Sequence, residues 1–249
     1  MRKNACELEI DLFCRGLRVP VSSALDEARG VRRTRAGLGS GLELVLPTGS
    51  RLKREIWMNA PIDEPFARQS PYVLYPRRDG PVILDERNGY RYEARIPRQP
   101  AWYDATTSSG TLMSRVGVLQ GTYLGIYINP VCEFWTQDLH CRFCTTGDNV
   151  GGAEASRKTI GDVVETCRAA KRESGITFVH LNGGFQGGRA LELVEPFVRA
   201  IKEQVGLLVG VQLAPERVMS RYDRLIAAGA DHLSFCMELM DPAWFAKVC

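Results

Sequence analysis

The sequence predicts an α/β protein in which a small β-rich N-terminal module precedes a parallel sheet with helical crossovers. From Gly121 to the end of the chain, apolar runs of strand length alternate with amphipathic helical patterns, which is typical of βαβ units. Before residue 115, short strand-like runs lie among many Arg, Pro and Gly residues. We therefore expect a β-rich module with a connecting arm over 1–115 and a domain of about four βα units over 116–249.

Composition and charge exclude several classes of protein. The 249 residues are 45% hydrophobic and 24% charged, which is ordinary for a soluble globular chain. A net charge of +3 does not indicate a nucleic-acid binder. No apolar run reaches the roughly 18–20 residues of a membrane span, and the N-terminus meets acidic residues before any apolar stretch of a secretory signal. We expect a cytoplasmic protein without a membrane or nucleic-acid partner.

The N-terminal module is expected to contain a strand at 42–46 and a hairpin formed by 82–84 and 90–96. The connection of the hairpin includes the Asn88-Gly89 step, which strongly favours a tight turn. Gly30–Gly41 is predicted to be a loop. No motif in this module has a chemistry that we can assign.

The second domain has a regular order of elements. Thr159 and Asp162 form a capping box at the start of its first long helix, and Gly175 is placed to end that helix. The predicted strands are 123–128, 176–181, 207–213 and 232–239, and the predicted helices are 160–173, about 191–201 and 218–228. Because ligands bind parallel sheets at the carboxyl ends of the strands, the loops after the first two strands are the candidate site.

The loop after the first strand holds three of the eight cysteines, in the pattern Cys132-x8-Cys141-x2-Cys144. In a reducing compartment, clustered cysteines indicate metal binding or catalysis rather than disulfides. Thiolates select zinc, Cu(I) or iron–sulfur clusters. Three thiolates leave one position of a four-iron cluster open for a substrate or cofactor.

These features resemble the radical S-adenosylmethionine superfamily. Its usual motif is C-x3-C-x2-C, in the loop after the first strand of a partial (β/α)6 barrel, with an aromatic residue before the last cysteine. Phe143 takes the aromatic position here, but the first spacing is eight residues instead of three, so Cys132 is the ligand to test. The resemblance covers about half of the chain, from Gly121 onward. It implies a partial βα barrel of the radical SAM type, a 4Fe-4S cluster on Cys132, Cys141 and Cys144, and S-adenosyl-L-methionine as cofactor.

The resemblance also implies cofactor-binding residues besides Phe143. Gly183 and Gly184 occupy the place of the family's Gly-Gly-Glu motif, which contacts the amino group of S-adenosylmethionine, although Phe185-Gln186 stand where the acid is expected. Ser234 and Glu238 are placed on the fourth strand to reach the ribose or the methionine moiety, and strand alternation would put them on one face.

A radical enzyme is the implied activity. The reduced cluster would cleave S-adenosylmethionine to a 5′-deoxyadenosyl radical that abstracts hydrogen from an unidentified substrate, with an electron donor such as flavodoxin or ferredoxin. No catalytic residue or reaction type can be assigned. The family barrel has six βα units and four strands are predicted here, which indicates a fragment of a longer protein or a chain completed by a partner.

Plainer interpretations stay open for several of these residues. Cys132, His140, Cys141 and Cys144 form a possible Cys3His zinc set, which would make the chain a binding or structural module. The glycine pair is also compatible with a tight turn, Gln186 with a solvated side chain, and Glu238 with a surface acid. Three further residues are expected in the core: Cys167 as a small hydrophobe, and His180 and His232 as histidines with satisfied hydrogen bonds.

Overall fold

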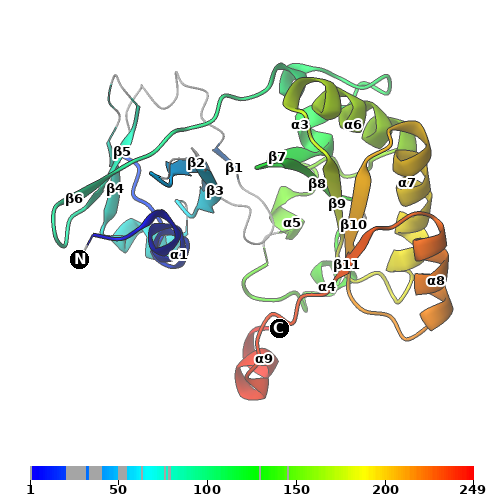
Figure 1. Cartoon of the computed structure of the whole chain (residues 1–249). Coiled ribbons are helices and arrows are strands. Elements are labelled where there is room, and N and C mark those ends of the chain that lie inside the picture. Colours follow the sequence, from blue (N-terminus) through cyan, green and yellow to red (C-terminus); the bar gives the residue numbers. More distant parts are fainter. Residues whose placement is uncertain are drawn as a thin grey trace. The chain divides into compact units, whose positions relative to one another are not determined.

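The chain folds into two compact units, Met1–Gln99 and Pro100–Cys249 (Figure 1). This is a computed structural model, and it describes residues 2–20, 32–33, 41–49, 55–62, 64–75, 77, 80–128, 130–144 and 146–249. This boundary comes earlier in the chain than residue 115, where the sequence predicted the end of the β-rich module and its connecting arm. The segment that begins at Pro100 belongs with the second unit because the backbone N–H of Trp102 donates to the carboxylate of Glu173 at 3.0 Å.

The first unit contains two three-stranded antiparallel sheets. Their strands are β1 (Arg32–Arg33), β2 (Gly41–Pro47) and β3 (Glu55–Ala60) in one sheet, and β4 (Tyr72–Tyr75), β5 (Val82–Asp85) and β6 (Tyr90–Glu93) in the other. The predicted strand at 42–46 and the predicted hairpin are confirmed, except that the second hairpin strand ends at Glu93 and not at residue 96. Gly89 has the positive φ of 73° that its turn requires. The prediction of a loop at Gly30–Gly41 was wrong for the described residues, because Arg32–Arg33 pair with β2 as strand β1 and Gly41 begins β2; the rest of that segment lies outside the described residues.

A helix that the sequence analysis did not predict, α1 (Ala5–Arg15), opens the first unit. Asn4 caps the backbone N–H of Glu7, and the Glu7 carboxylate accepts from the backbone N–H of Asn4 in return. Leu8 and Leu12 are buried in the core that the helix shares with the strands. The unit also has a short 3-10 helix, η2 (Pro65–Gln69).

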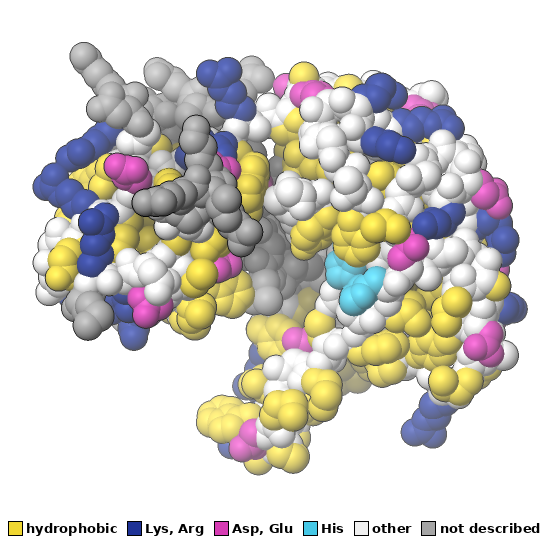
Figure 2. All heavy atoms as spheres, in the orientation of Figure 1, with side chains coloured by type: hydrophobic (Ala, Val, Ile, Leu, Met, Phe, Trp, Pro, Cys, Tyr) yellow, Lys and Arg dark blue, Asp and Glu magenta, His cyan; other side chains and the backbone are white. Residues whose placement is uncertain are grey.

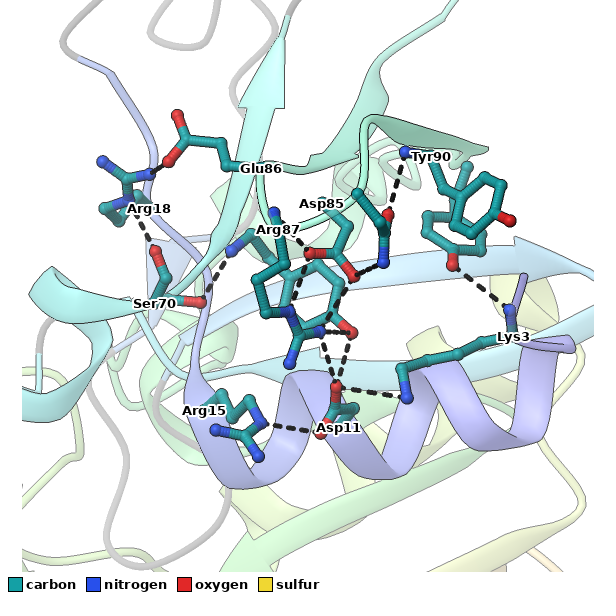
Figure 3. A network of polar contacts seen from close by, with 12 residues as sticks. Lys3, Asp11, Arg15, Arg18, Ser70, Asp85, Glu86, Arg87 and Tyr90 are labelled. Atoms are coloured by element: carbon teal, nitrogen blue, oxygen red, sulfur yellow. Dashed lines mark hydrogen bonds and ion pairs between the residues drawn. The ribbon is translucent and has the colours of Figure 1, made fainter. Parts of the chain in front are cut away.

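A polar network fastens α1 to the second sheet of this unit (Figure 3). Asp11 accepts hydrogen bonds from the hydroxyl of Tyr72 at 2.5 Å and from Arg87 at 3.0 Å. The same guanidinium pairs with the fully buried carboxylate of Asp85 at 2.8 Å and holds the pKa of that carboxyl below its usual value. Every buried charge here has a partner, so the network is structural.

The second unit is built on one mixed sheet of order β11-β10-β9-β8-β7. Its strands are β7 (Val118–Gln120), β8 (Tyr123–Tyr127), β9 (Phe178–Asn182), β10 (Leu208–Gln212) and β11 (His232–Ser234). The four strands from β8 to β11 are parallel, as predicted, whereas β7 was not predicted and runs antiparallel to β8. Over the described residues this sheet is open and does not close into a barrel.

Helices cover one face of this sheet (Figure 1). These are α6 (Ile160–Ser174), α7 (Ala190–Gln204) and α8 (Met219–Ala227). The shorter helices η3 (Ala101–Asp104) and α3 (Met113–Val116) pack against α6. The predicted capping box of Thr159 and Asp162 is present, and Gly175 ends α6 in the left-handed conformation. Cys167 is fully buried in this layer, as expected. None of the described helices is long and apolar enough to cross a membrane.

The prediction of a long fourth strand was wrong. β11 ends at Ser234, which pairs with Gln212, the last residue of β10, so the chain beyond Ser234 has no strand on that side to pair with. Glu238 therefore does not share a strand face with Ser234. The chain ends in α9 (Pro242–Val248), where the side chain of Asp241 caps the first turn.

Candidate functional site

The three clustered cysteines lie in one loop at the carboxyl end of β8. Cys132 directly precedes the short helix α4 (Glu133–Thr136), and the backbone N–H of Cys144 donates to the carbonyl of Cys141 at 2.9 Å. All three thiols are free and partly buried. Among the residues that the structure describes, however, no three His, Cys, Asp or Glu side chains lie close enough to hold one metal ion. Both ligand sets therefore remain predictions: the three cysteines for a 4Fe-4S cluster, and the same cysteines with His140 for zinc.

The loop of Cys132 packs directly against the glycine turn that follows β9. A Cβ atom on Gly184 would stand 2.4 Å from the Cβ and 2.9 Å from the Cα of Cys132, so only glycine fits. The backbone N–H of Glu133 donates to the carbonyl of Phe185 at 3.0 Å. The two loops that the sequence singled out are therefore in contact.

Tyr127, the last residue of β8, links the same two loops. Its hydroxyl accepts a hydrogen bond from the backbone N–H of Gly184 at 3.2 Å and donates to the carbonyl of Pro130 at 3.3 Å. Burial raises the pKa of Tyr127, so the phenol stays neutral and keeps its hydrogen to donate. The sequence pattern indicates only that this residue belongs to an apolar strand.

Gln186 fixes the start of the cysteine loop. Its side-chain amide donates to the carbonyls of Pro130 and Val131, both at 3.0 Å, and the residue is buried rather than solvated. A carboxylate has no hydrogen to donate to these carbonyls, so both hydrogen bonds require the amide. Next to it, the ring of Phe185 stacks on Phe134 with the ring centroids 4.8 Å apart.

Trp135 contacts the last cysteine of the motif. Its indole N–H donates to the Sγ atom of Cys144 at 3.4 Å, and its ring stacks on His140 with the centroids 3.8 Å apart. Gly147 in α5 (Thr146–Asn149) leaves room for the indole, because a Cβ there would lie 2.2 Å from a ring carbon. An N–H donor to a cysteine sulfur is a standard way to tune a thiolate cluster.

A cavity of about 470 Å³ opens beside the Cys141–Cys144 turn. It is lined by Arg142, Phe143, Glu238, Leu239, Trp244 and Val248. The backbone N–H of Arg142 donates to the carbonyl of Val248 at 2.8 Å and so attaches α9 to the cysteine loop. The volume is in the range of small-molecule sites. Two predicted cofactor-binding residues, Phe143 and Glu238, thus line the same cavity.

Cys141 lies close to this cavity. Burial, followed by negative charge at Cys249, Cys144 and Glu238, raises the pKa of the Cys141 thiol to about 11. A bound metal cation would reverse this preference, because it stabilises the thiolate.

Gly183 and Ser234 lie at the same edge of the sheet but do not line the cavity. The backbone N–H of Gly183 donates to the carbonyl of Gln212 at 3.2 Å. The Oγ atom of Ser234 is buried and finds no hydrogen-bond partner in the described part of the chain. Of the five predicted cofactor-binding residues, Phe143 and Glu238 line one cavity, and Gly184 packs against Cys132.

Lys158 is a buried lysine in the segment between the cysteine loop and α6. The ammonium group of Lys158 donates to the carbonyl of Tyr127 at 2.8 Å and pairs with Glu154 at 2.9 Å. It also donates to the carbonyl of Ala155 at 3.2 Å, and because the side chain is only 2% exposed, these partners hold the charge in place. It anchors the carboxyl end of β8, where the cysteine loop begins.

Comparisons with protein-family models, with curated proteins and with solved structures gave no match to this chain.

Proposed function

We propose that the second unit is a radical S-adenosylmethionine enzyme domain of the partial-barrel type, in which Cys132, Cys141 and Cys144 hold a 4Fe-4S cluster. The observation that carries the proposal is the contact between Cys132 and Gly184. It joins the predicted cluster loop to the predicted cofactor turn at the carboxyl edge of a parallel sheet, where such sheets bind their ligands.

The chemistry of the donor set fits the cluster. Three free thiols lie on one loop, with the N–H group of Trp135 directed at the sulfur of Cys144. Because the described side chains hold no preformed set of three ligands, the sulfurs must converge when a cluster binds. When bound, the cluster would supply the electron that cleaves S-adenosylmethionine to methionine and a 5′-deoxyadenosyl radical.

The residues of the chain would bind and orient the cofactor. The backbone carbonyls of the Gly183–Gly184 turn are acceptors for its ammonium group. In the cavity, Glu238 is an acceptor for hydroxyl or ammonium groups, Arg142 is a partner for a carboxylate, and Phe143 offers an apolar wall. A flavodoxin or ferredoxin would deliver the electron, and a cytoplasmic location agrees with that requirement.

Anaerobic reconstitution with iron and sulfide tests the proposal. The full chain should bind about four irons and acquire broad visible absorption. After reduction, it should release 5′-deoxyadenosine from S-adenosylmethionine. Stoichiometric zinc in a colourless, air-stable protein would contradict the proposal and favour a structural Cys3His site instead.

A further inference from the structure

Cys249, which follows α9, lies beside the first cysteine of the C-x2-C pair. The backbone N–H of Arg142, the residue after Cys141, donates to the carbonyl of Val248, the residue before Cys249, at 2.8 Å. The thiol of Cys141 donates to the carbonyl oxygen of Cys249, 3.9 Å from its Sγ atom. Two segments that are 108 positions apart in the sequence therefore bring a fourth cysteine to the cysteine loop.

The two cysteines are within reach of a disulfide. The contact of 3.9 Å keeps the Sγ atom of Cys141 at most about 6 Å from the Cα atom of Cys249. In a disulfide the same two atoms are about 4 Å apart. Rotation of the two side chains and a small displacement of α9 therefore suffice to join them.

The helix α9 has little to oppose such a displacement. None of its residues is buried. Figure 2 shows hydrophobic side chains over α9 at the lower end of the unit, and Trp244 and Phe245 are 58% and 45% exposed. A helix that buries so little apolar surface shifts at a low cost in free energy.

A small oxidant can reach this cysteine pair. Both thiols are free and partly exposed. Arg142 and Val248, their neighbours in the sequence, line the cavity of about 470 Å³. The pair is thus at the wall of an open site and not in the core.

Cys144 is the competing partner of Cys141, because the cysteines of C-x2-C pairs form disulfides in oxidoreductases. Here the Sγ atom of Cys144 accepts from the indole N–H of Trp135 at 3.4 Å, and its thiol donates to the hydroxyl of Thr146 at 3.2 Å. The thiol of Cys141 is directed at Cys249 instead. These contacts favour Cys249 as the partner.

We propose that Cys249 is a resolving cysteine, which forms a disulfide with Cys141 when the cluster-free chain meets a peroxide. One thiol reacts first: its sulfur takes an oxygen atom of hydrogen peroxide, the O–O bond breaks, and a sulfenic acid and one water form. The second thiol attacks this sulfur, the S–S bond forms, the S–O bond breaks, and a second water leaves. The two sulfurs together lose two electrons, which the peroxide gains.

The disulfide withdraws Cys141 from the predicted ligand set and protects it. A sulfenic acid without a partner is oxidised further to sulfinic and sulfonic acids, which thiol reductants do not restore. A dithiol reductant returns both thiols from the disulfide. The protective role rests on the proposed function, but the disulfide requires neither cluster nor S-adenosylmethionine, so the two proposals can fail separately.

Peroxide treatment of the full, cluster-free chain, followed by peptide mass spectrometry, tests the pair. Free thiols are alkylated, and trypsin separates Cys141 from Cys144 by cutting after Arg142. We expect the main linked pair to be Cys141–Cys249 within one chain, and dithiothreitol to release it. The proposal is overturned by a main pair of Cys141 with Cys144 or Cys132, by a link only between two chains, or by an unmodified Cys249 after Cys141 is oxidised.

Two variants test the protection of Cys141. After peroxide and then dithiothreitol, Cys249→Ser should contain at least about twofold more Cys141 as sulfinic or sulfonic acid than the parent chain. Cys236→Ser, which alters an exposed cysteine beyond the end of β11, should match the parent. Equal over-oxidation of Cys141 in Cys249→Ser and in the parent would overturn the proposal.

Discussion

Gly184 lies so close to Cys132 that a single added carbon on the glycine would stand 2.4 Å from the cysteine Cβ. The two residues belong to loops after different strands, β8 and β9, and this contact is where the cysteine loop meets the glycine turn. The geometry of the first predicted cluster ligand therefore depends on a residue 52 positions later that lacks a side chain.

Substituting Gly184→Ala should displace the cysteine loop. The new methyl group would meet the backbone of Cys132 as well as its side chain, and overpacking of this kind costs about 1–3 kcal/mol. We expect a lower midpoint of thermal unfolding and a loss of most of the reconstituted iron. The matched control is Gly188→Ala. Alanine is strained at the positive φ of 72° of this position, but its methyl group would meet no atom within 4 Å. Equal iron contents in both variants would contradict the role of the contact.

Gln186→Glu should loosen the start of the cysteine loop. The carboxylate cannot donate to the carbonyls of Pro130 and Val131, and losing donors to buried acceptors costs about 1–3 kcal/mol each. Hydrogen exchange over 130–144 should accelerate about tenfold or more, while exchange in α7 stays unchanged. Gln204→Glu, at the exposed end of α7, is the control. Identical exchange in 130–144 for the parent and Gln186→Glu would show that the amide has no such role.

Trp135→Phe should change the potential of a bound cluster with little change in stability. Phenylalanine retains a ring to stack on His140 but loses the N–H that donates to Cys144. Because a donor stabilises the more negatively charged, reduced cluster, its loss should lower the reduction potential by about 40 mV, which corresponds to about 1 kcal/mol for one electron. A redox titration followed by electron paramagnetic resonance measures the shift. An unchanged or higher potential would contradict this assignment.

The start of α6 should be sensitive to acid. Burial by itself raises the pKa of Asp162, but hydrogen bonds from Ser109, Thr107 and Thr159 outweigh it and lower the pKa from 3.8 to about 2. The unfolded chain thus binds a proton first, so this stabilisation is complete above about pH 4 and is lost as the pH falls to about 2. The expected loss is about 2 kcal/mol.

Urea titrations of the full chain between about pH 6 and pH 2 measure this loss. Asp162→Asn keeps the shape of the side chain but does not titrate, so its stability should fall by about 2 kcal/mol less over that interval. The same pH dependence in both chains would contradict a contribution from Asp162.

The regular part of the fold was predictable because its patterns are local. The strands at β8, β9 and β10 are apolar runs of the expected length, and α6 begins at the capping box of Thr159 and Asp162. The helix α1 was missed although Asn4 and Glu7 form the same kind of capping box. The length of β11 was not predictable, because it depends on where its neighbour β10 ends at Gln212.

The candidate site was predictable in its position but not in its contacts. Placing Cys132 and Gly184 on neighbouring loops follows from the order of strands in a parallel sheet. The roles of Tyr127 and Gln186 depend on atoms from distant segments that meet only after folding. The role of Trp135 depends on how its own irregular loop brings the indole to Cys144 and His140. The expectation that His180 and His232 are core histidines with satisfied hydrogen bonds was wrong, because the Nε2 atom of His180 is buried without a partner among the described residues and His232 is exposed. An apolar strand pattern does not show which face of the sheet remains without helices.

Cleavage of S-adenosylmethionine by the reconstituted, reduced chain tests the central claim most directly. We expect release of 5′-deoxyadenosine by the parent chain and by Cys6→Ala, which alters an exposed cysteine of α1. We expect release at background level from Cys132→Ala, because the cluster would lose its first ligand. Background release from the parent chain despite a full complement of iron, or undiminished release from Cys132→Ala, would contradict the account.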